Sequence, residues 1–379
     1  MEKGDIGKAS ALMMTAVFAG FLLFFAVGFI TMPFQGVNYT EQRLYAPKPK
    51  CSFESVINGE FEQGMEDYLS DHIILREELI TLKHDLSSVF GRTLPKIAYK
   101  GKDGQYFLRY REYTQGMEAT ISAFRSLARE QEVPVDMLLV PDATVMLPEL
   151  LPICAVNDDQ QASAEKIISS LKDDVNIYYA YDRLKELKAQ GMQLYYKTDQ
   201  HWTTDCAKDI FEWYMRQSGQ QLKEISYTKQ ETPDFYGNLY TASPSFFSEP
   251  DKVAYYAADG GEYELEWLGE DRHSDSLFDN SWIMGIRNRY NIFFGGSFHN
   301  LRIRSNAPKG RILVLADSYA MPVVTFLADQ YSDVAVIDLR NFDKNKNTVK
   351  ELLGDFEPER ILFVNTVYQI SCGSLKDVG

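Results

Sequence analysis

Two distant segments of the sequence contain the residue types that acyl-transfer chemistry uses. His201 stands two residues after Asp199 and directly before a tryptophan. This spacing lets the carboxylate reach the imidazole Nδ1, which fixes the tautomer that leaves Nε2 free as a base. Further along the chain, the apolar run 311–316 ends in an aspartate followed by Ser318. If Ser318 is a nucleophile, it completes a Ser–His–Asp set with His201 and Asp199.

The place of Ser318 at the end of an apolar run favours this chemistry. Catalytic groups of open parallel sheets gather beyond the carboxyl ends of the strands. The helix predicted after Ser318 would also direct its unpaired N–H groups toward the serine oxygen, as an oxyanion hole requires. The simpler alternative is that Ser318 only caps that helix.

Other readings of the histidines stay open. Asp-x-His pairs are common on protein surfaces, so the spacing around His201 is weak by itself. A metal site needs a third ligand, and the sequence near His201 offers none at metal spacing. We therefore expect neither a metal nor a cofactor. His72 follows Asp71 inside a helical pattern, and it is predicted to make a hydrogen bond at a helix junction.

The elements that must position these residues alternate between strand and helix. Between residues 61 and 90 the apolar spacing predicts two helices that meet near Ser70-Asp71, and residues 105–108 begin a short strand. Such alternation indicates a parallel sheet covered by helices. The stretch from about 222 to 306 interrupts the alternation and is predicted to be a β-rich insertion. Strands are predicted at 135–140, 175–180, 311–316, 334–339 and 361–364, and helices at 117–131, 162–171, 181–190, 321–330 and 349–353.

Composition excludes several classes of protein. The chain has 379 residues, a net charge of −15, 45% hydrophobic residues and 13% aromatic residues. A chain this acidic lacks the clustered basic surface that nucleic acid requires, and one this apolar is not intrinsically disordered. Its four cysteines form no CxxC pair, which argues against a zinc ribbon, and one or two disulfides remain open.

The N-terminal region predicts a membrane anchor. Residues 9–32 carry no charge, and a helix of this length reaches about 36 Å, enough to cross a hydrocarbon core of about 30 Å. Lysines within residues 1–8 predict a cytoplasmic N-terminus and an exported remainder. Residues 33–60 are predicted to be a linker, and 61–379 a single domain. A cleaved signal peptide is the alternative, although the apolar run exceeds the usual h-region.

The chain resembles the DHHW family of exported bacterial proteins. These are relatives of the alginate O-acetyltransferases AlgJ and AlgX in the SGNH-hydrolase-like superfamily. The sequence departs from the family pattern at Gln200, where the family has a second histidine, and at Ala316, where relatives often have lysine or glycine. The resemblance is carried by Tyr68-Leu69-Ser70-Asp71-His72 with Arg76, Gly101-Lys102-Asp103-Gly104, Val140-Pro141, Asp199-Gln200-His201-Trp202-Thr203, Phe293-Phe294-Gly295-Gly296, Asp317-Ser318-Tyr319, Phe326-Leu327 and Val336-Ile337-Asp338-Leu339-Arg340.

The resemblance implies an SGNH-like α/β fold and a role for each site residue. Ser318 would attack an acyl ester while His201, oriented by Asp199, takes its proton. The acetyl-serine would then pass to a sugar hydroxyl or to water. Arg340 would hold the oxyanion or the substrate, unless it forms a surface ion pair with Asp338 or Asp343.

Two further residues are weaker candidates. Asn365, at the end of the last predicted strand, would be a second oxyanion donor. Tyr319 would shape the acyl pocket, and a purely structural role in the core is the alternative.

The resemblance also implies partners. An exported enzyme has no acetyl-CoA on its side of the membrane, so a membrane-bound O-acyltransferase would supply the acyl group. The acceptor would be an exopolysaccharide or a cell-wall polymer. Two alternatives remain open: a carbohydrate acetyl esterase with the same triad, and a non-catalytic glycan-binding or scaffold subunit of a polysaccharide export assembly. Arg302, Arg304, Lys309 and Arg311 either bind an anionic glycan or flank a solvated strand.

Overall fold

The computed structural model describes residues 3–31, 36–38, 41, 43–89, 97–153, 155–281, 288–341, 356–373 and 375. The chain forms two compact units, the first made of Met1–Arg92 with Pro244–Phe246 and the second of Thr93–Ser243 with Phe247–Gly379. The predicted bounds of the domain, 61–379, stay a prediction. Each unit is described by itself below.

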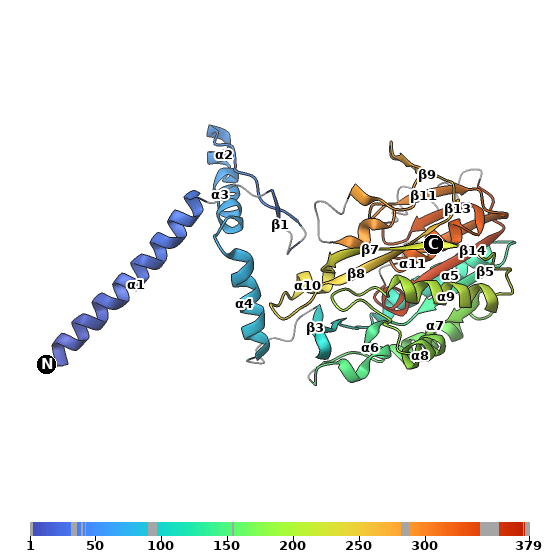
Figure 1. The fold of residues 1–379 in the computed structure, drawn as a ribbon, viewed down its shortest axis with the longest axis horizontal. Helices are drawn as coiled ribbons and strands as arrows, with labels where there is room; N and C mark the ends of the chain where they lie inside the picture. Colours follow the sequence, from blue (N-terminus) through green and yellow to red (C-terminus); the bar gives the residue numbers. More distant parts are fainter. Residues whose placement is uncertain are drawn as a thin grey trace. The chain divides into compact units, whose positions relative to one another are not determined.

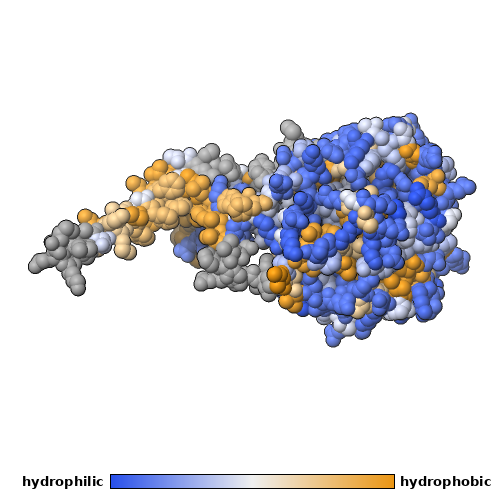
Figure 2. Space-filling view, turned by 60° about the horizontal axis from the view of Figure 1, so that its bottom comes forward, coloured by the Kyte–Doolittle hydropathy of each residue, from blue (hydrophilic) through white to orange (hydrophobic). Residues whose placement is uncertain are grey.

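The first unit begins with helix α1, Lys3–Thr31. Its stretch Ser10–Thr31 is long and apolar enough to span a membrane, and it is the one helix of this kind within the described residues. Its apolar side chains are exposed, among them Met13 and Phe18, and Figure 2 shows this apolar surface in orange. An all-round apolar surface of this length is typical of a helix in lipid.

Short elements follow α1. Strands β1 (Val37–Asn38) and β2 (Arg43–Leu44) pair antiparallel, and helix α2 (Phe53–Ile57) begins at the Ser52 capping box. The predicted linker 33–60 thus contains a hairpin and a helical turn. These elements belong to the first unit rather than to a bare tether.

The two helices predicted between residues 61 and 90 are confirmed as α3 (Glu60–Asp71) and α4 (Arg76–Val89). His72 is the C-cap of α3, and its Nδ1 donates to the carbonyl oxygen of Tyr68 at 2.8 Å. The predicted helix-junction hydrogen bond is therefore confirmed. Asp71 accepts two hydrogen bonds from Arg43, at 2.8 and 2.5 Å, which ties the β1–β2 hairpin to the end of α3.

The second unit is built on an eight-stranded sheet with the order β10-β9-β11-β13-β12-β14-β5-β6 (Figure 1). The strands from β13 to β6 in this order run parallel to one another, and β11, β9 and β10 continue the sheet antiparallel at one edge. The strands are β5 (Val135–Val140), β6 (Asn176–Tyr179), β9 (Tyr263–Trp267), β10 (His273–Ser274), β11 (Asn300–Ser305), β12 (Lys309–Ala316), β13 (Tyr331–Asp338) and β14 (Arg360–Thr366).

Hydrophobic cores cover both faces of the sheet, as the continuous apolar runs predict. Alternate residues of β14 join different cores: Leu362 and Val364 belong to the larger one, and Ile361 and Phe363 to the smaller one. Helices α8 (Tyr181–Ala189), α9 (Thr204–Gln217) and α11 (Ala320–Ala328) contribute to the larger core, and α5 (Thr114–Arg129), α7 (Gln160–Leu171) and α13 (Val367–Ser371) contribute to the smaller core.

The structure confirms the mixed α/β fold and refines its insertion. The stretch from about 222 to 306 contains an antiparallel hairpin of β7 (Tyr227–Phe235) and β8 (Asp251–Ala258). It also supplies β9, β10 and β11 to the central sheet, so it is not a separate appendage. The predicted short strand is β4 (Tyr106–Leu108), paired with β3 (Ala98–Lys100). The helix predicted at 349–353 lies outside the described residues.

Candidate active site

Asp199 and His201 lie in a short closed loop. An antiparallel bridge joins Tyr195 to Trp202, and the Tyr196 N–H donates to the His201 carbonyl oxygen at 3.1 Å. The loop is so tight that Asp199 Oδ1 accepts both the His201 N–H, at 3.0 Å, and the His201 Nδ1–H. Both side chains are buried. The arrangement fixes the imidazole tautomer with its proton on Nδ1, as the spacing predicts.

The Asp199 carboxylate is held on its other side as well. Oδ2 accepts the backbone N–H of Asn238 at 2.8 Å, at the start of the short helix α10 (Asn238–Ala242). Gly237 packs so closely on this carboxylate that an added Cβ would overlap it. Burial alone would raise the pKa of Asp199, but His201 and the N–H donors outweigh it and hold that pKa below its usual value. The group is therefore an ionised partner for the imidazole.

Ser318 lies in the turn between β12 and α11. The N-cap position of α11 is Tyr319, and no side chain caps the helix. The alternative in which Ser318 serves as the helix cap is therefore not what the structure shows. The preceding residue, Asp317, fixes the turn instead: its Oδ1 accepts the Tyr319 N–H and its Oδ2 accepts the Thr366 N–H, both at 2.8 Å. This anchors the turn to the end of β14.

Four contacts link the His201 loop and the Ser318 turn, two of them through Tyr290. The ring of Tyr290 stacks on the His201 imidazole, with 4.0 Å between centroids and 9° between planes, and its hydroxyl donates to the Ser318 carbonyl oxygen at 2.9 Å. The Trp202 indole N–H donates to the Tyr319 carbonyl oxygen at 3.0 Å, and the Tyr319 hydroxyl donates to the Gln200 carbonyl oxygen. His201 Nε2 is buried and has no hydrogen-bond partner in the described part of the chain. A base with a free, shielded nitrogen thus lies beside the serine turn.

Residues 103–281 match the family described as "SGNH hydrolase-like domain, acetyltransferase AlgX". The protein carries an SGNH hydrolase-like domain. The match includes Asp199 and His201 and ends before Ser318. The resemblance expected from the sequence is thereby confirmed.

Solved structures resemble a larger share of the chain than the family match covers. A DHHW family protein from Eubacterium siraeum is 19% identical, with a TM-score of 0.61, covering 74% of this chain and 98% of that chain. PatB1 of Bacillus cereus is 20% identical, with a TM-score of 0.58 and coverages of 74% and 98%. A second PatB1 structure, with a sulfonyl adduct, is 21% identical with a TM-score of 0.60, covering 75% and 99%. At this identity the likeness concerns the fold. No curated protein matches the chain.

Arg340 of the SGNH-like domain is paired with a neighbour in sequence. Its guanidinium binds both oxygens of the buried Asp338, at 2.9 and 2.5 Å. Its charge also acts on the serine turn: burial raises the pKa of Asp317, and the Thr366 and Tyr319 N–H groups together with the Arg340 charge oppose that rise. The predicted ion pair with Asp338 therefore exists, and Asp343, the other predicted partner, lies outside the described residues.

Asn365 occupies a different place. It is fully buried, and neither side-chain amide atom has a hydrogen-bond partner in the described residues, so no hydrogen bond joins it to His201 or Ser318. The alternation along β14 places it on the face of Ile361 and Phe363, toward the smaller core. The ring of Tyr319, in contrast, lies 5.1 Å from that of His201.

Sequence reasoning missed two residues of this site. Tyr290 lies 28 positions before the serine that it contacts, and only its place just before the Phe293-Phe294-Gly295-Gly296 motif could have drawn attention to it. Gly237 carries no chemical group, so its contact with Asp199 has no signal in the sequence.

Three of the four basic residues in the stretch 302–311 pair with acidic side chains, and the fourth, Lys309, donates to the Gln221 carbonyl oxygen. Arg302 binds Asp333 at 2.7 Å, Arg304 approaches Glu264 and Glu266, and Arg311 approaches Glu359. These pairs fit the interpretation of a solvated strand face. Within the described residues, no group of acidic, histidine or cysteine side chains has the arrangement of a metal site.

Proposed function

We propose that this protein is a membrane-anchored, extracytoplasmic O-acetyltransferase that modifies an exopolysaccharide or a cell-wall glycan. The observation that supports it most is the buried Asp199–His201 pair, whose Nε2 has no hydrogen-bond partner among the described residues, in a loop that Trp202 joins to the Ser318 turn. The Tyr290 contacts hold the two parts together. The acetyltransferase-type domain supplies the class of reaction.

In the first half-reaction, Ser318 Oγ attacks the carbonyl carbon of an acetyl ester while His201 Nε2 takes the hydroxyl proton. The new Oγ–C bond forms, the bond to the leaving alkoxide breaks, and the imidazolium returns its proton to that alkoxide. The ionised Asp199 stabilises the imidazolium, because it is fixed by His201 and Asn238 and cannot turn away. The product is acetyl-Ser318.

In the second half-reaction a sugar hydroxyl replaces the leaving group. It loses its proton to His201 Nε2 and attacks the acetyl carbon, and the serine oxygen recovers the proton when the acyl bond breaks. Of the predicted oxyanion candidates, Arg340 is the better supported, because its charge acts on Asp317 beside the nucleophile. Asn365 lies toward the opposite face of the sheet.

The proposed location follows from α1. The stretch Ser10–Thr31 is suited to span the membrane, and Lys3 and Lys8 before it favour a cytoplasmic N-terminus. The acetyl donor is then proposed to be a membrane-bound O-acyltransferase, since acetyl-CoA is cytoplasmic.

The test measures hydrolysis of an acetyl ester by the purified full-length chain. Ser318→Ala and His201→Ala are each expected to lower kcat by at least about 10³-fold, because triad members act as a unit. Ser332→Ala, a half-buried serine on β13, is the matched control and should leave kcat unchanged. A sulfonyl fluoride should label the parent but not Ser318→Ala. Circular dichroism confirms that each variant is folded.

Adding candidate glycans then separates transfer from hydrolysis. An O-acetylated glycan formed at the expense of free acetate supports the transferase. Hydrolysis that no glycan diverts would indicate an acetyl esterase. Folded variants as active as the parent would contradict the triad.

A further inference from the structure

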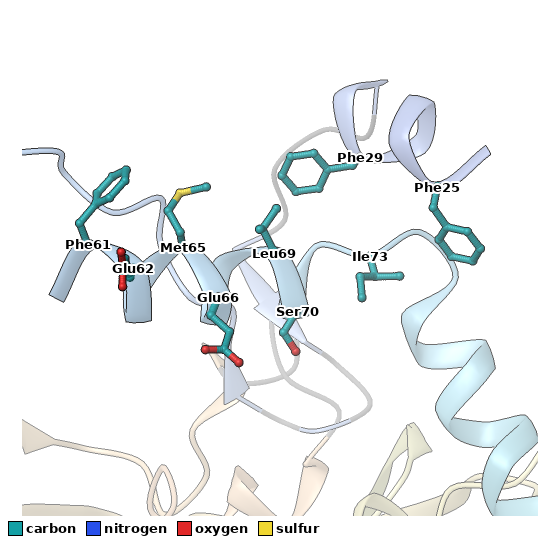
Figure 3. Close-up of a pocket in the computed structure, with 9 residues that line it drawn as sticks. All are labelled: Phe25, Phe29, Phe61, Glu62, Met65, Glu66, Leu69, Ser70 and Ile73. Atoms are coloured by element: carbon teal, nitrogen blue, oxygen red, sulfur yellow. The ribbon is translucent and has the colours of Figure 1, made fainter. Parts of the chain in front are cut away.

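The first unit contains an apolar groove away from the catalytic residues. Its volume is about 680 Å³, within the range of about 300–1,000 Å³ that small-molecule sites occupy. Figure 3 shows the phenylalanines of α1 and the side chains of α3 that form it. Its walls are Phe25 and Phe29 from α1, Phe61, Met65 and Leu69 from α3, and Ile73 after it, with Glu62, Glu66 and Ser70 at its edge.

Close packing at the end of α1 builds this groove. Gly28 lies against Ile74, so closely that an added Cβ would be 2.8 Å from the isoleucine Cγ2. The ring of Phe29 meets that of Tyr68 edge-on, with 5.9 Å between centroids. Phe61 begins a ridge of apolar residues that recur every fourth position along α3. The groove is the space that this ridge leaves beside α1.

The walls of the groove lie at a defined depth along α1. Phe25 and Phe29 stand six and two residues before Thr31, the last residue of the candidate span. At about 1.5 Å per residue, they lie roughly 9 and 3 Å inside the end of that span. If α1 crosses the bilayer, the groove lies at the outer edge of the hydrocarbon core, just inside the headgroups. Lipid chains are the molecules present at that depth.

We propose that this groove holds an acyl chain of a lipid in the outer leaflet. The inference rests on the membrane anchor of the proposed function and not on its chemistry. Leu69 and Ile73 are 42% and 41% exposed. Exposure of such apolar side chains to water is unfavourable, and contact with a lipid chain would remove it. In Figure 3 Glu66 and Ser70 point away from Met65 and Leu69, as in a helix that lies at a membrane interface.

Fluorescence quenching by brominated lipids tests this site. The full-length chain, with Leu69→Trp, is reconstituted in phosphatidylcholine vesicles whose acyl chains carry bromine near the headgroup. The signal of the four native tryptophans is subtracted with the parent chain. The added fluorescence of Leu69→Trp should be strongly lost in brominated vesicles. Gln63→Trp, at an exposed position across α3, is the matched control and should lose much less.

Two outcomes would overturn the proposal, and they differ. If the chain floats with the vesicles but Leu69→Trp and Ile73→Trp are quenched no more than Gln63→Trp, the groove is not a lipid site and the anchor stands. If the parent does not float with vesicles, the anchor fails and this inference falls with it. The ester hydrolysis assay is independent of both results.

Discussion

Tyr290 gives the sharpest test of how the site is held together. Tyr290→Phe keeps the ring on His201 and removes only the hydroxyl that donates to the Ser318 carbonyl oxygen at 2.9 Å. The Ser318 carbonyl oxygen still accepts one long hydrogen bond, from the Met321 N–H at 3.4 Å. The free energy lost with the tyrosine hydroxyl should therefore be near the low end for a buried hydrogen bond, about 1 kcal/mol. If this whole loss raises the free energy of the transition state, kcat falls about fivefold, because ~1.4 kcal/mol corresponds to a tenfold change in rate.

Tyr290→Leu removes the ring as well. A stacked pair adds about 0.5–1.5 kcal/mol beyond the area that it buries, and truncating a buried aromatic residue leaves a cavity. We therefore expect a larger fall in kcat than for the phenylalanine variant, together with a loss of several kcal/mol in the free energy of unfolding.

The assay separates kcat from KM for ester hydrolysis and measures urea unfolding in parallel. Tyr255→Phe is the matched control, because the Tyr255 hydroxyl donates to Gln230 Oε1 at 2.6 Å, in the β7–β8 hairpin. The control should lose stability and keep its kcat. If Tyr290→Phe behaves like the control, with kcat unchanged, Tyr290 is only a core residue and the reasoning is refuted.

Three further predictions follow from buried charges and close contacts. Burial raises the pKa of Asp329 from 3.8 to about 6 against its bonds to Tyr263 and Tyr227, so the folded state keeps a proton that the unfolded state releases. The free energy of unfolding should fall by about 2 kcal/mol from pH 4 to 6, and Asp329→Asn should flatten that slope in urea titrations. Gly237→Ala should displace Asp199 and lower kcat at least about tenfold. The control is Gly36→Ala, because a Cβ added at Gly36 would have no atom within 4 Å. Arg340→Leu should lower the free energy of unfolding by about 3–5 kcal/mol, because it leaves the buried Asp338 charge unpaired. Adding Asp338→Asn should restore most of that free energy in thermal or urea unfolding. Equal stability of the single and double variants would contradict the pairing.

The sequence was most informative where burial alone dictates the pattern. Strand β5 was predicted at residues 135–140 and has those bounds, because a strand buried on both faces is mostly apolar, here with Asp136 as the one charged residue, and proline ends it. Helix α9 was not predicted, although Cys206, Ile210 and Tyr214 recur at helical spacing behind the Thr203 cap. Its cap, Thr203, comes two residues after the histidine of the Asp-x-His motif, and that motif favoured an interpretation in terms of chemistry.

The candidate site was predictable in its acids and bases but not in its supports. Asp-x-His is a local pattern, so the Asp199–His201 contact follows from spacing alone. The stacking of Tyr290 and the contact of Gly237 depend on chain segments that meet only in the folded sheet. Nothing in the order of residues shows such meetings, because they are set by packing and not by sequence distance.

The position of β12 has a consequence for when the protein becomes active. The strand that leads to Ser318 lies between β13 and β14, and both of these follow it in the sequence. During synthesis the nucleophile therefore has no complete sheet around it until the 50 residues Asp317–Thr366 have been added, roughly 3–10 s at ~5–20 residues per second. A nascent chain, or one clipped before Arg360, lacks the β14 partner of the nucleophile strand. The acyl chemistry proposed for Ser318 thus requires a partner strand that is synthesised after the serine itself.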